Sequence, residues 1–555
     1  MKVFRHELAA RASDASRRRW FYVPYDQLSS ELGPLSRIEP SEAGIVLVEA
    51  PAKAARRPYH QQKLALVIAN QRQFALEQAA RGVAVRVVVA RAGYAEALEP
   101  LATELGGLHM MAAAERELRV ELAPLVERGR LAVYPHEGWL TTRADFLAIG
   151  DAPWRMDAFY RRVRERTGIL MERGRPAGGR FSHDAENRKP WRGTPPAPDA
   201  PRFEPDAVTR EVGELIESRY AHHPGTLDLS ALPTTAADAE ALWRWALEAC
   251  LPEFGPFEDA MSVRSPGLFH TRVSSLLNLH RLLPGRLVHD VAQHAALPLS
   301  SREGFVRQIL GWREFVRHVH VETDGFRSIA GEATHIAARA GDGGFGRWRG
   351  EPWPPAASAG DAGALRSALD AREPLPPAYW GEASGLACLD HVVAGVWRDG
   401  WSHHITRLMI LSNLATLLGF DPRELTDWFW VAYTDAYDWV VEPNVLAMGT
   451  YALGDLMTTK PYVSGANYIH RMSDYCESCR FDPKKTCPIT PAYWAFLARN
   501  AEALAGNPRL QVPLAALRNR SAAVRAEDAR VATALRGALG RGEVVTPEGL
   551  GTGRE

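Results

Sequence analysis

The chain has 555 residues, which is more than one hydrophobic core usually serves, so we expect two or more domains. Hydrophobic residues make up 46% and charged residues 24%, and the 66 Lys and Arg residues equal the 66 Asp and Glu residues in number. This composition excludes a disordered chain, a collagen-like repeat and a histone-like polycation, so any contact with nucleic acid must come from a local basic patch.

The N-terminus lacks an apolar signal core, and the best apolar stretch, 408–420, is too short to cross a membrane. Five cysteines in 555 residues cannot form a disulfide framework. We therefore expect a protein of the reducing cytoplasm that has no membrane partner and whose cysteines have another role.

The first part of the chain, to about residue 135, alternates between strand and helix patterns. Apolar runs at 20–23, 45–49 and 83–89 predict strands, and the run 60–81 predicts a helix. The near-continuous apolar second strand is typical of a mostly parallel, doubly wound sheet that is covered on both faces. No GxGxxG motif follows the first strand, so a plain Rossmann dinucleotide site is not expected.

The chain then becomes rich in Gly, Pro and Arg between Met171 and Pro205, which predicts an interdomain crossover. After Pro205 helical spacing dominates, and a Gly-rich and Pro-rich loop interrupts it between Gly341 and Pro377. The predicted division is an N-terminal extension (1–19), an α/β domain (20–140), a crossover (141–205), a large all-α domain (206–510) and a C-terminal helical tail (511–555).

Three cysteines lie close together: Cys476, Cys479 and Cys487 form C-x2-C-x7-C. A zinc ion or an iron-sulfur cluster needs a fourth ligand, and the candidates are Cys388 and Cys250. We choose Cys388 because it adjoins a tryptophan-rich region, whereas Cys250 lies in an apolar core pattern. The spacing alone leaves zinc, an iron-sulfur cluster and simple buried thiols open.

Aromatic residues concentrate in the helical domain. Six of the sixteen tryptophans fall between residues 380 and 439, namely Trp380, Trp397, Trp401, Trp428, Trp430 and Trp439. They indicate either core packing or a chain for electron hopping, because indoles bury large areas and are also readily oxidised.

The same region contains WSHHITRLMILSN. On a regular helix, His404, Arg407, Leu408 and Leu411 share one face, and His403 points about 100° away. Two adjacent helical histidines cannot easily ligate one metal ion. A histidine that faces a cofactor beside an arginine is therefore the sharper hypothesis, although either residue could be part of a core.

Ten blocks of sequence carry a more specific signal. In order they are DQLS (26–29), HQQK (60–63), FYRRVRERTGILM (159–171), GGRFSHDAENRKP (178–190), EGFVRQILGWREF (303–315), SHHITRLMILSN (402–413), DAYDWVVEPNVLAMG (435–449), TKPYVSGANYIHRMSDYCESC (459–479), CP (487–488) and YW (493–494). With these blocks the chain resembles the iron-sulfur bacterial cryptochromes and photolyases, the prokaryotic (6-4) photolyase branch of the photolyase/cryptochrome superfamily.

The resemblance implies a flavoprotein with FAD in the helical domain. It implies flavin contacts from Arg407, Asp435, Asn444, Gln308 and Trp312. It also implies that Trp428 and Trp380, with Tyr437 as a third member, carry electrons to the flavin. A four-iron four-sulfur cluster is implied on Cys388, Cys476, Cys479 and Cys487, although the loop between the last two is shorter than is typical of the family.

The implied activity is that of a DNA photolyase, a carbon-carbon lyase that uses light and reduced FAD to reverse (6-4) photoproducts. His404 matches the proton donor, His403 stands beside it, and Tyr462 and Tyr468 match residues of the lesion pocket. Two alternatives remain: a cryptochrome-like blue-light sensor, and a non-photochemical iron-sulfur DNA-binding protein.

The implied partner is UV-damaged DNA, bound by a monomer. The candidates for phosphate contact are Arg173, Arg175, Arg180, Arg188, Lys189, Lys460, Arg480, Lys484 and Lys485. Relatives that bind a ribityl-lumazine antenna tend to have an acid and an aromatic residue after the second strand. This chain has Lys53 and Arg56 there, a departure that weakens the expectation of an antenna.

Overall fold

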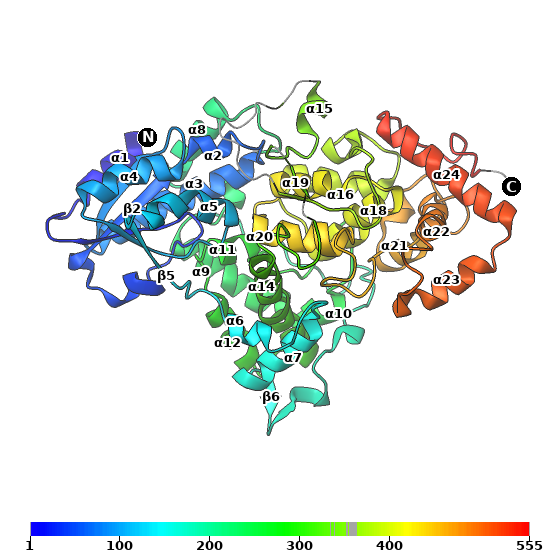
Figure 1. Cartoon of the computed structure of the whole chain (residues 1–555), viewed down its shortest axis with the longest axis horizontal. Coiled ribbons are helices and arrows are strands. Elements are labelled where there is room, and N and C mark those ends of the chain that lie inside the picture. Colours follow the sequence, from blue (N-terminus) through cyan, green and yellow to red (C-terminus); the bar gives the residue numbers. More distant parts are fainter. Residues whose placement is uncertain (1, 334, 338, 351–352, 354–362, 554–555) are drawn as a thin grey trace.

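A five-stranded sheet lies at the N-terminal end of the molecule (Figure 1). Its strands are β1 (Arg19–Tyr22), β2 (Ala43–Glu49), β3 (Ala84–Val89), β4 (Leu108–Met111) and β5 (Leu131–Tyr134), in the order β3-β2-β1-β4-β5 with every neighbouring pair parallel. The register places Phe21 opposite Ile45 on one side and His109 on the other. All residues of β2 are buried, which explains its unbroken apolar sequence. The predicted parallel α/β sheet is confirmed.

Helices cover the sheet: α1 (Lys2–Ala10), α2 (Pro51–Ala54), α3 (Gln61–Ala80), α4 (Tyr94–Glu104) and α5 (Arg116–Glu127). Helix α3 begins at the cap residue His60, whose Nδ1 accepts a hydrogen bond from the Gln62 amide (3.0 Å). Its Lys63 Nζ donates to the carbonyl oxygens of Trp430 (2.9 Å) and Ala436 (2.5 Å) and so ties the sheet region to the helical region. Helix α1, which lies in the extension, packs through the buried Phe4.

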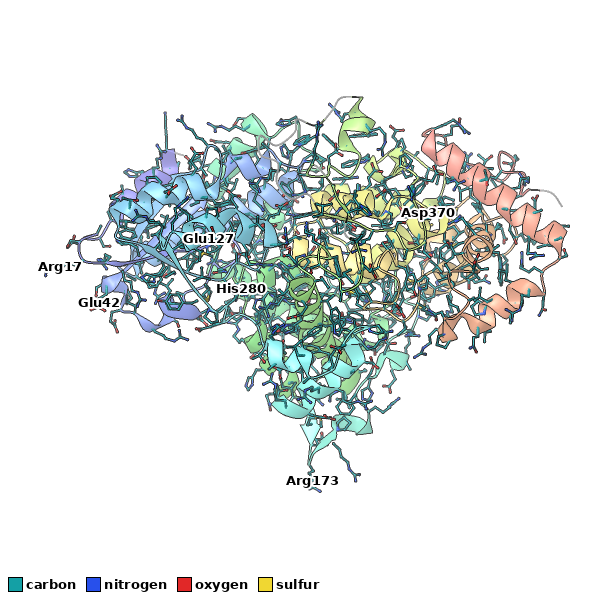
Figure 2. The ribbon with its side chains drawn as sticks, in the orientation of Figure 1. Arg17, Glu42, Glu127, Arg173, His280 and Asp370 are labelled. Atoms are coloured by element: carbon teal, nitrogen blue, oxygen red, sulfur yellow. The ribbon has the colours of Figure 1, made fainter. Side chains whose placement is uncertain are left out.

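The chain leaves the sheet through α6 (Arg143–Leu147), α7 (Met156–Thr167) and a hairpin of β6 (Met171–Glu172) and β7 (Arg175–Pro176). Arg173, at the turn of this hairpin, projects into solvent at the tip of the molecule (Figure 2). The segment from 188 to 206 has no helix or strand, as its proline content predicts.

The rest of the chain is helical, and the all-α prediction is confirmed apart from the pair β8 (His335–Ile336) and β9 (Ala364–Leu365). The helices are α8 (Ala207–Arg219), α9 (Ala236–Trp245), α10 (Leu251–Phe257), α11 (Ser274–Asn278), α12 (Pro284–Gln293), α13 (Leu299–Val306), α14 (Glu314–Glu322), α15 (Phe345–Arg349), α16 (Ala387–Asp399), α17 (His404–Thr406), α18 (Asn413–Leu418), α19 (Pro422–Ala432), α20 (Asp438–Val441), α21 (Ala466–Met472), α22 (Ile489–Arg499), α23 (Gln511–Arg518) and α24 (Ala522–Gly540).

This computed structural model describes residues 2–333, 335–337, 339–350, 353 and 363–553. The loop expected at 341–377 therefore lies partly outside the described residues, and its described part contains α15 and β9. One core cluster runs from Tyr22 and Val46 of the sheet to Trp428 of α19 and Leu535 of α24. Among the described helices, none has an apolar stretch long enough to cross a membrane.

Candidate functional site

A cavity lies in the helical region, and three π-helical segments form much of its wall: Arg307–Arg313, Arg407–Ser412 and Glu442–Gly449. A π-helical turn is wider than an α-helical turn and occurs frequently at functional sites. All five residues expected to contact a flavin line this one cavity, namely Gln308, Trp312, Arg407, Asp435 and Asn444. Regular helical spacing could not predict the π-helical turns that bring them together.

An ion pair crosses the cavity wall. Arg407 donates from Nη1 and Nη2 to the two carboxylate oxygens of Asp435 (3.0 and 2.9 Å), and Ser274 Oγ donates to Asp435 Oδ2 (2.6 Å). Burial disfavours the charged carboxylate, but Arg407 and the hydrogen bonds outweigh burial and lower the pKa of Asp435. The Arg407 guanidinium also lies 4.0 Å from the ring centre of Tyr433. The wall therefore holds a charged, precisely oriented pair.

The other expected contacts are held by neighbours within the wall. Asn444 Nδ2 donates to the Val440 carbonyl (2.8 Å), and Gln308 Nε2 donates to Glu258 Oε1 (2.6 Å). Trp312 packs edge-on against Phe315, with ring centres 6.2 Å apart. These bonds fix the side chains while leaving the Asn444 amide oxygen without a protein donor among the described residues.

Sequence reasoning missed two arginines of this cavity, Arg272 and Arg313. Burial lowers the pKa of Arg313 to about 10, and its Nε and Nη1 atoms are buried without a hydrogen-bond acceptor among the described residues. Arg272 lies over the ring of Trp401 at 4.4 Å. The block around Arg313 also contains Arg307, Glu303 and Glu314, so no signal in the sequence distinguishes Arg313. Its Nη2 donates to the Leu277 carbonyl (3.4 Å) and its Nη1 lies 3.5 Å from Glu314 Oε1, so the guanidinium is only partly satisfied. A partly satisfied guanidinium at a cavity wall is suited to an anionic ligand group.

His403 and His404 also line the cavity, but α17 begins only at His404. His403 precedes the helix in an extended conformation (φ −76°, ψ 165°), so the two imidazoles do not point 100° apart as a helix would require. Both approach His270: the rings of His270 and His403 stack at 4.4 Å, and His404 stands edge-on to His270 at 5.4 Å. One nitrogen from each of the three lies within 4.8 Å of the others.

The three imidazoles differ in environment. Burial lowers the pKa of His270 and of His403 well below the usual value, so both are neutral at neutral pH. His403 Nδ1 and His270 Nε2 are buried without a hydrogen-bond partner among the described residues. The His404 side chain is 40% exposed, and its Nε2 lies 3.8 Å from Asp259 Oδ1, close enough for an ion pair when the imidazole is protonated. Of the three, His404 is thus the one that solvent and a ligand can reach.

Tyr462 and Tyr468 do not line this cavity. Burial raises the pKa of the Tyr468 phenol, and the nearby Asp259 carboxylate raises it further. Burial and Asp184 raise the pKa of Tyr462 in the same way. Asp259 thus influences both Tyr468 and the exposed imidazole of His404.

Four indoles form a row that leads away from the cavity. Phe429 lines the cavity and contacts Trp428 (ring centres 5.2 Å apart). From Trp428 the ring-centre distances are 5.7 Å to Trp397, 4.9 Å from Trp397 to Trp380, and 5.8 Å from Trp380 to the partly exposed Trp348. Trp397 thus lies between Trp428 and Trp380, the two tryptophans that the resemblance implied, and Trp348 forms the outer end of the row.

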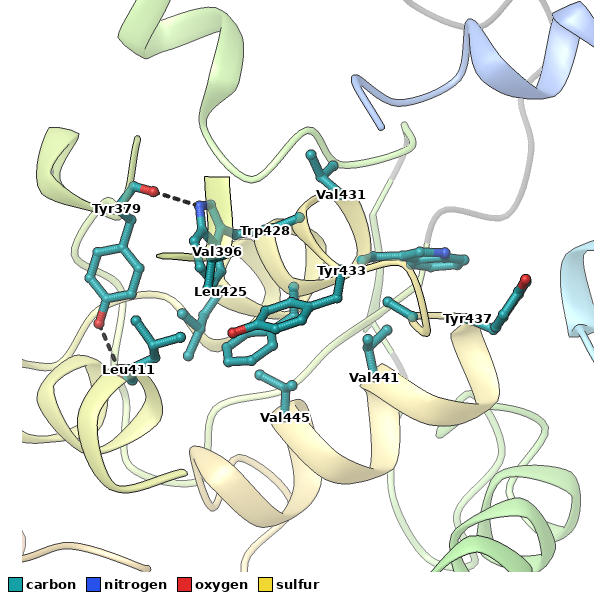
Figure 3. Close-up of a cluster of buried hydrophobic side chains, with 14 of the residues drawn as sticks. Tyr379, Val396, Leu411, Leu425, Trp428, Val431, Tyr433, Tyr437, Val441 and Val445 are labelled. Carbon is teal, nitrogen blue, oxygen red and sulfur yellow. Dashed lines mark hydrogen bonds between the residues drawn. The ribbon is translucent and has the colours of Figure 1, made fainter. Parts of the chain in front are cut away.

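Tyr437 is not brought into this row. In Figure 3 it lies on the side of the cluster opposite Tyr379, the residue whose carbonyl accepts the Trp428 indole hydrogen bond (2.9 Å). Its ring stacks on Tyr25 at 6.3 Å, and Lys63 Nζ lies 5.4 Å from its centre. Tyr437 is the residue before α20, nine residues after Trp428 of α19, and its position in the sequence does not reveal that it packs against the sheet region.

The four cysteines implied as cluster ligands come together. Burial raises the pKa of Cys388 well above its usual value, and the neighbouring thiols of Cys487, Cys479 and Cys476 raise it further. Cys250 lies elsewhere, where its thiol donates to the His270 carbonyl (3.8 Å). Among the described residues, the histidine trio is the one group close enough to hold a single metal ion, and the cysteines do not form such a group.

A second cavity, of about 600 Å³, lies at the carboxyl ends of the sheet strands. Its lining includes Tyr25, which follows β1, and Glu115, which follows β4, on the two sides of the point where the strand order reverses. Lys53 Nζ lies 2.5 Å from Glu115, and Arg56 pairs with Glu121 (2.8 Å). The two cations that depart from the family pattern are therefore neutralised by carboxylates and leave the cavity open.

The residues expected to contact DNA phosphates are only partly available. Arg180 pairs with Glu186 (2.5 Å), and Arg188 pairs with Asp184 and lies 3.7 Å from Asp259. Arg173 and Arg175 of the β6/β7 hairpin, by contrast, are exposed.

Comparison with known proteins agrees with this architecture. Residues 21–231 match the family model described as deoxyribodipyrimidine photo-lyase-related protein. The chain is 32% identical over 510 residues to the (6-4) photolyase of Agrobacterium fabrum, covering 88% of this chain and 93% of that protein. The crystal structure of a bacterial class III photolyase from Agrobacterium tumefaciens has the same fold, with a TM-score of 0.53 and 14% identity over 96% of this chain and 99% of that chain. The chain therefore belongs to the bacterial photolyase and cryptochrome family that includes the Agrobacterium (6-4) photolyase.

Proposed function

We propose that this protein is a DNA photolyase that reverses (6-4) photoproducts with light and FAD. The observation that carries the proposal is the exposed His404 imidazole at the wall of the cavity, with Asp259 3.8 Å away. A light-driven repair site needs a proton donor between the cofactor cavity and solvent. A flavin-binding light sensor does not need such a donor.

The residues of the cavity fit FAD. Arg407 and Asp435 offer a charged pair to the polar edge of the flavin or to its ribityl chain, and the free amide oxygen of Asn444 offers an acceptor. The partly satisfied guanidinium of Arg313 and that of Arg272, which lines the same cavity, are suited to the pyrophosphate. When bound and reduced, FAD supplies an electron upon excitation by light.

The chain's own groups then position, protonate and shield the lesion. A damaged, poorly stacked pair of bases is flipped out of the duplex at low cost, and His404 donates a proton to it. His270 and His403 are neutral, so they do not compete with His404 for the role of acid, and the His270 ring packs edge-on against it. The Tyr468 phenol stays protonated and can donate a hydrogen bond to the lesion.

We infer that Cys388, Cys476, Cys479 and Cys487 hold a four-iron four-sulfur cluster. The four thiols are neighbours, as the four thiolate ligands of such a cluster must be. The resemblance to the iron-sulfur branch of the family favours this cluster over zinc.

The DNA contact and the antenna complete the proposal. The exposed Arg173 and Arg175 are the first candidates for phosphate contact, because Arg180 and Arg188 are already paired. The second cavity supports a planar antenna chromophore between Tyr25 and Glu115. Heat denaturation of the purified protein should release a fluorescent chromophore other than FAD if the antenna is present.

The His404→Asn variant tests the proton donor. Asparagine keeps a hydrogen-bond donor but cannot supply a proton at neutral pH, so binding of damaged DNA and flavin content should persist while repair falls by about 10²-fold or more. His289→Asn, at an exposed histidine outside the cavity, is the matched control and should repair normally. Full repair by His404→Asn would contradict the role of His404 as proton donor, on which the proposal depends.

A further inference from the structure

A third cavity, of about 630 Å³, lies at the outer end of the tryptophan row. It is bounded by α15, by α16, by the turn Pro377–Trp380 and by the loop 221–226. Three of the four indoles of the row, Trp348, Trp380 and Trp397, belong to its wall. The row therefore ends in a cavity lined by aromatic rings and not on a flat surface.

Hydrogen bonds distinguish the outermost indole from the others. Trp428 and Trp397 both donate to the Tyr379 carbonyl (2.9 and 2.8 Å), and Trp380 donates to the Gly343 carbonyl (3.1 Å). Trp348 donates to a carboxylate, Glu382 Oε1 (2.9 Å). A carboxylate stabilises a positive charge on its partner more than a neutral carbonyl does. When Trp428 loses an electron, the resulting tryptophan radical cation is therefore most stable at Trp348, beside the cavity.

The charges around this cavity are mostly paired. Asp390 accepts hydrogen bonds from Ser384 and from the Gly385 amide, and Arg398 pairs with Asp399 (2.7 Å). Arg349, 5.8 Å from the Trp348 ring centre, has no carboxylate partner within the described part of the chain. Glu382 and Asp390 of the same wall accept hydrogen bonds only from neutral donors within the described residues, so the cavity presents charges of both signs next to an aromatic wall.

We propose that this cavity binds a dihydronicotinamide nucleotide, which refills the tryptophan row with single electrons. Such a molecule has a flat dihydropyridine ring and an aromatic adenine for the wall and phosphates for Arg349, and its size suits a cavity of this volume. A small neutral thiol would need neither feature. The inference rests on the proposed electron transfer from Trp428 towards the flavin.

The electrons balance in single steps. Trp428 gives one electron towards the flavin cavity and becomes a radical cation. Trp397, Trp380 and Trp348 each then give one electron to the preceding tryptophan, so that the radical cation ends at Trp348. The bound nucleotide gives one electron to Trp348, which restores the neutral indole, and loses one proton to water. The nucleotide radical then leaves and gives its second electron to dioxygen, so that each nucleotide supplies one electron to the row.

Binding is tested in the dark on the purified full chain with NADH and NADPH as separate probes, by calorimetry and by quenching of tryptophan fluorescence. Arg349→Ala should raise Kd at least tenfold, since it removes the charged partner of the phosphates. Ala394→Phe should abolish binding, because Ala394 is an exposed residue of α16 at the cavity wall and a phenyl ring there fills the space. Arg525→Ala, an exposed arginine of α24 outside the cavity, is the matched control and should bind as the wild type does.

Photoreduction supplies the second readout. With NADH its rate should saturate at a concentration near the Kd measured in the dark, and Ala394→Phe should remove the saturation while still allowing photoreduction by dithiothreitol. Absence of dark binding at millimolar NADH and NADPH, or binding that both variants leave unchanged, would overturn the proposed site. Tight binding with a rate independent of NADH would overturn the electron-donor role. Failure of dithiothreitol to support photoreduction in the wild type would instead refute the proposed tryptophan relay.

Discussion

Removal of the Asp435 carboxylate should strongly destabilise the helical domain. In the Asp435→Ala variant, Arg407 loses both of its carboxylate hydrogen bonds, and Ser274 loses the acceptor 2.6 Å away. The Arg407 side chain is 22% exposed and that of Asp435 is 6% exposed, so water cannot fully replace the lost partner. What remains for the guanidinium is the Ser402 carbonyl, 2.8 Å from Nε, and the Tyr433 ring.

The expected cost is about 3–5 kcal/mol, the usual penalty when one partner of a buried ion pair is removed. Two hydrogen bonds to a charged group, at about 1.5–3 kcal/mol each, give a similar sum. At about 2–4 °C per kcal/mol, the midpoint of thermal unfolding should fall by about 6 °C or more. Flavin occupancy should fall as well, because the cavity wall loses its fixed charge pair.

Thermal and urea unfolding of three variants test this reasoning. The double variant Asp435→Ala/Arg407→Met should recover most of the lost stability, because it leaves no unpaired buried charge. Glu240→Ala, which breaks the 2.7 Å surface pair with Arg286 at side-chain exposures of 49% and 39%, should cost less than about 1 kcal/mol. A cost for Asp435→Ala no larger than that for Glu240→Ala would refute the view that the pair is a buried, structurally essential element.

Three further outcomes follow. Cys388→Ser should lose iron and acid-labile sulfide while Cys250→Ser keeps both, and the reverse result would reassign the fourth ligand. Trp397→Phe should slow photoreduction of the flavin and leave the flavin bound. An unchanged rate would show that the row of indoles serves only core packing. Burial lowers the pKa of His60 and His223 from 6.5 to about 4. As the pH falls, these histidines are therefore protonated in the unfolded chain before they are protonated in the folded chain. The free energy of unfolding should accordingly fall as the pH drops from about 6.5 to about 4. His60→Gln should flatten this dependence in urea unfolding at several pH values; an equal slope would contradict the assignment.

The sequence predicts those parts of the fold that depend on neighbours along the chain. The apolar run 45–49 and the helical run 60–81 appear as β2 and α3 to within two residues at each end, because burial on both sheet faces and a cap at His60 act locally. The strands β4 and β5 were not assigned residue by residue, because each has only four residues and little periodicity.

The site itself depends on contacts between distant segments. Trp397 of α16 lies between Trp380 and Trp428 of α19 because tertiary packing brings these separate segments together, and no spacing along the chain expresses that. The extended backbone at His403 and the buried charge of Arg313 likewise arise from tertiary packing. The resemblance named the residues around the cavity, whereas their partners, such as His270 and Asp259, became visible only in three dimensions.

The most direct test of the proposed repair activity uses duplex DNA that carries one defined (6-4) photoproduct, with a matched duplex that carries a cyclobutane dimer. The purified protein with reduced FAD is mixed with each duplex, half of each mixture is illuminated with blue light, and the remaining lesion is quantified. We expect the (6-4) lesion to disappear in the illuminated sample and to persist in the dark. A (6-4) lesion that remains intact under illumination, in protein that binds FAD and is photoreduced, would contradict repair and favour a light sensor.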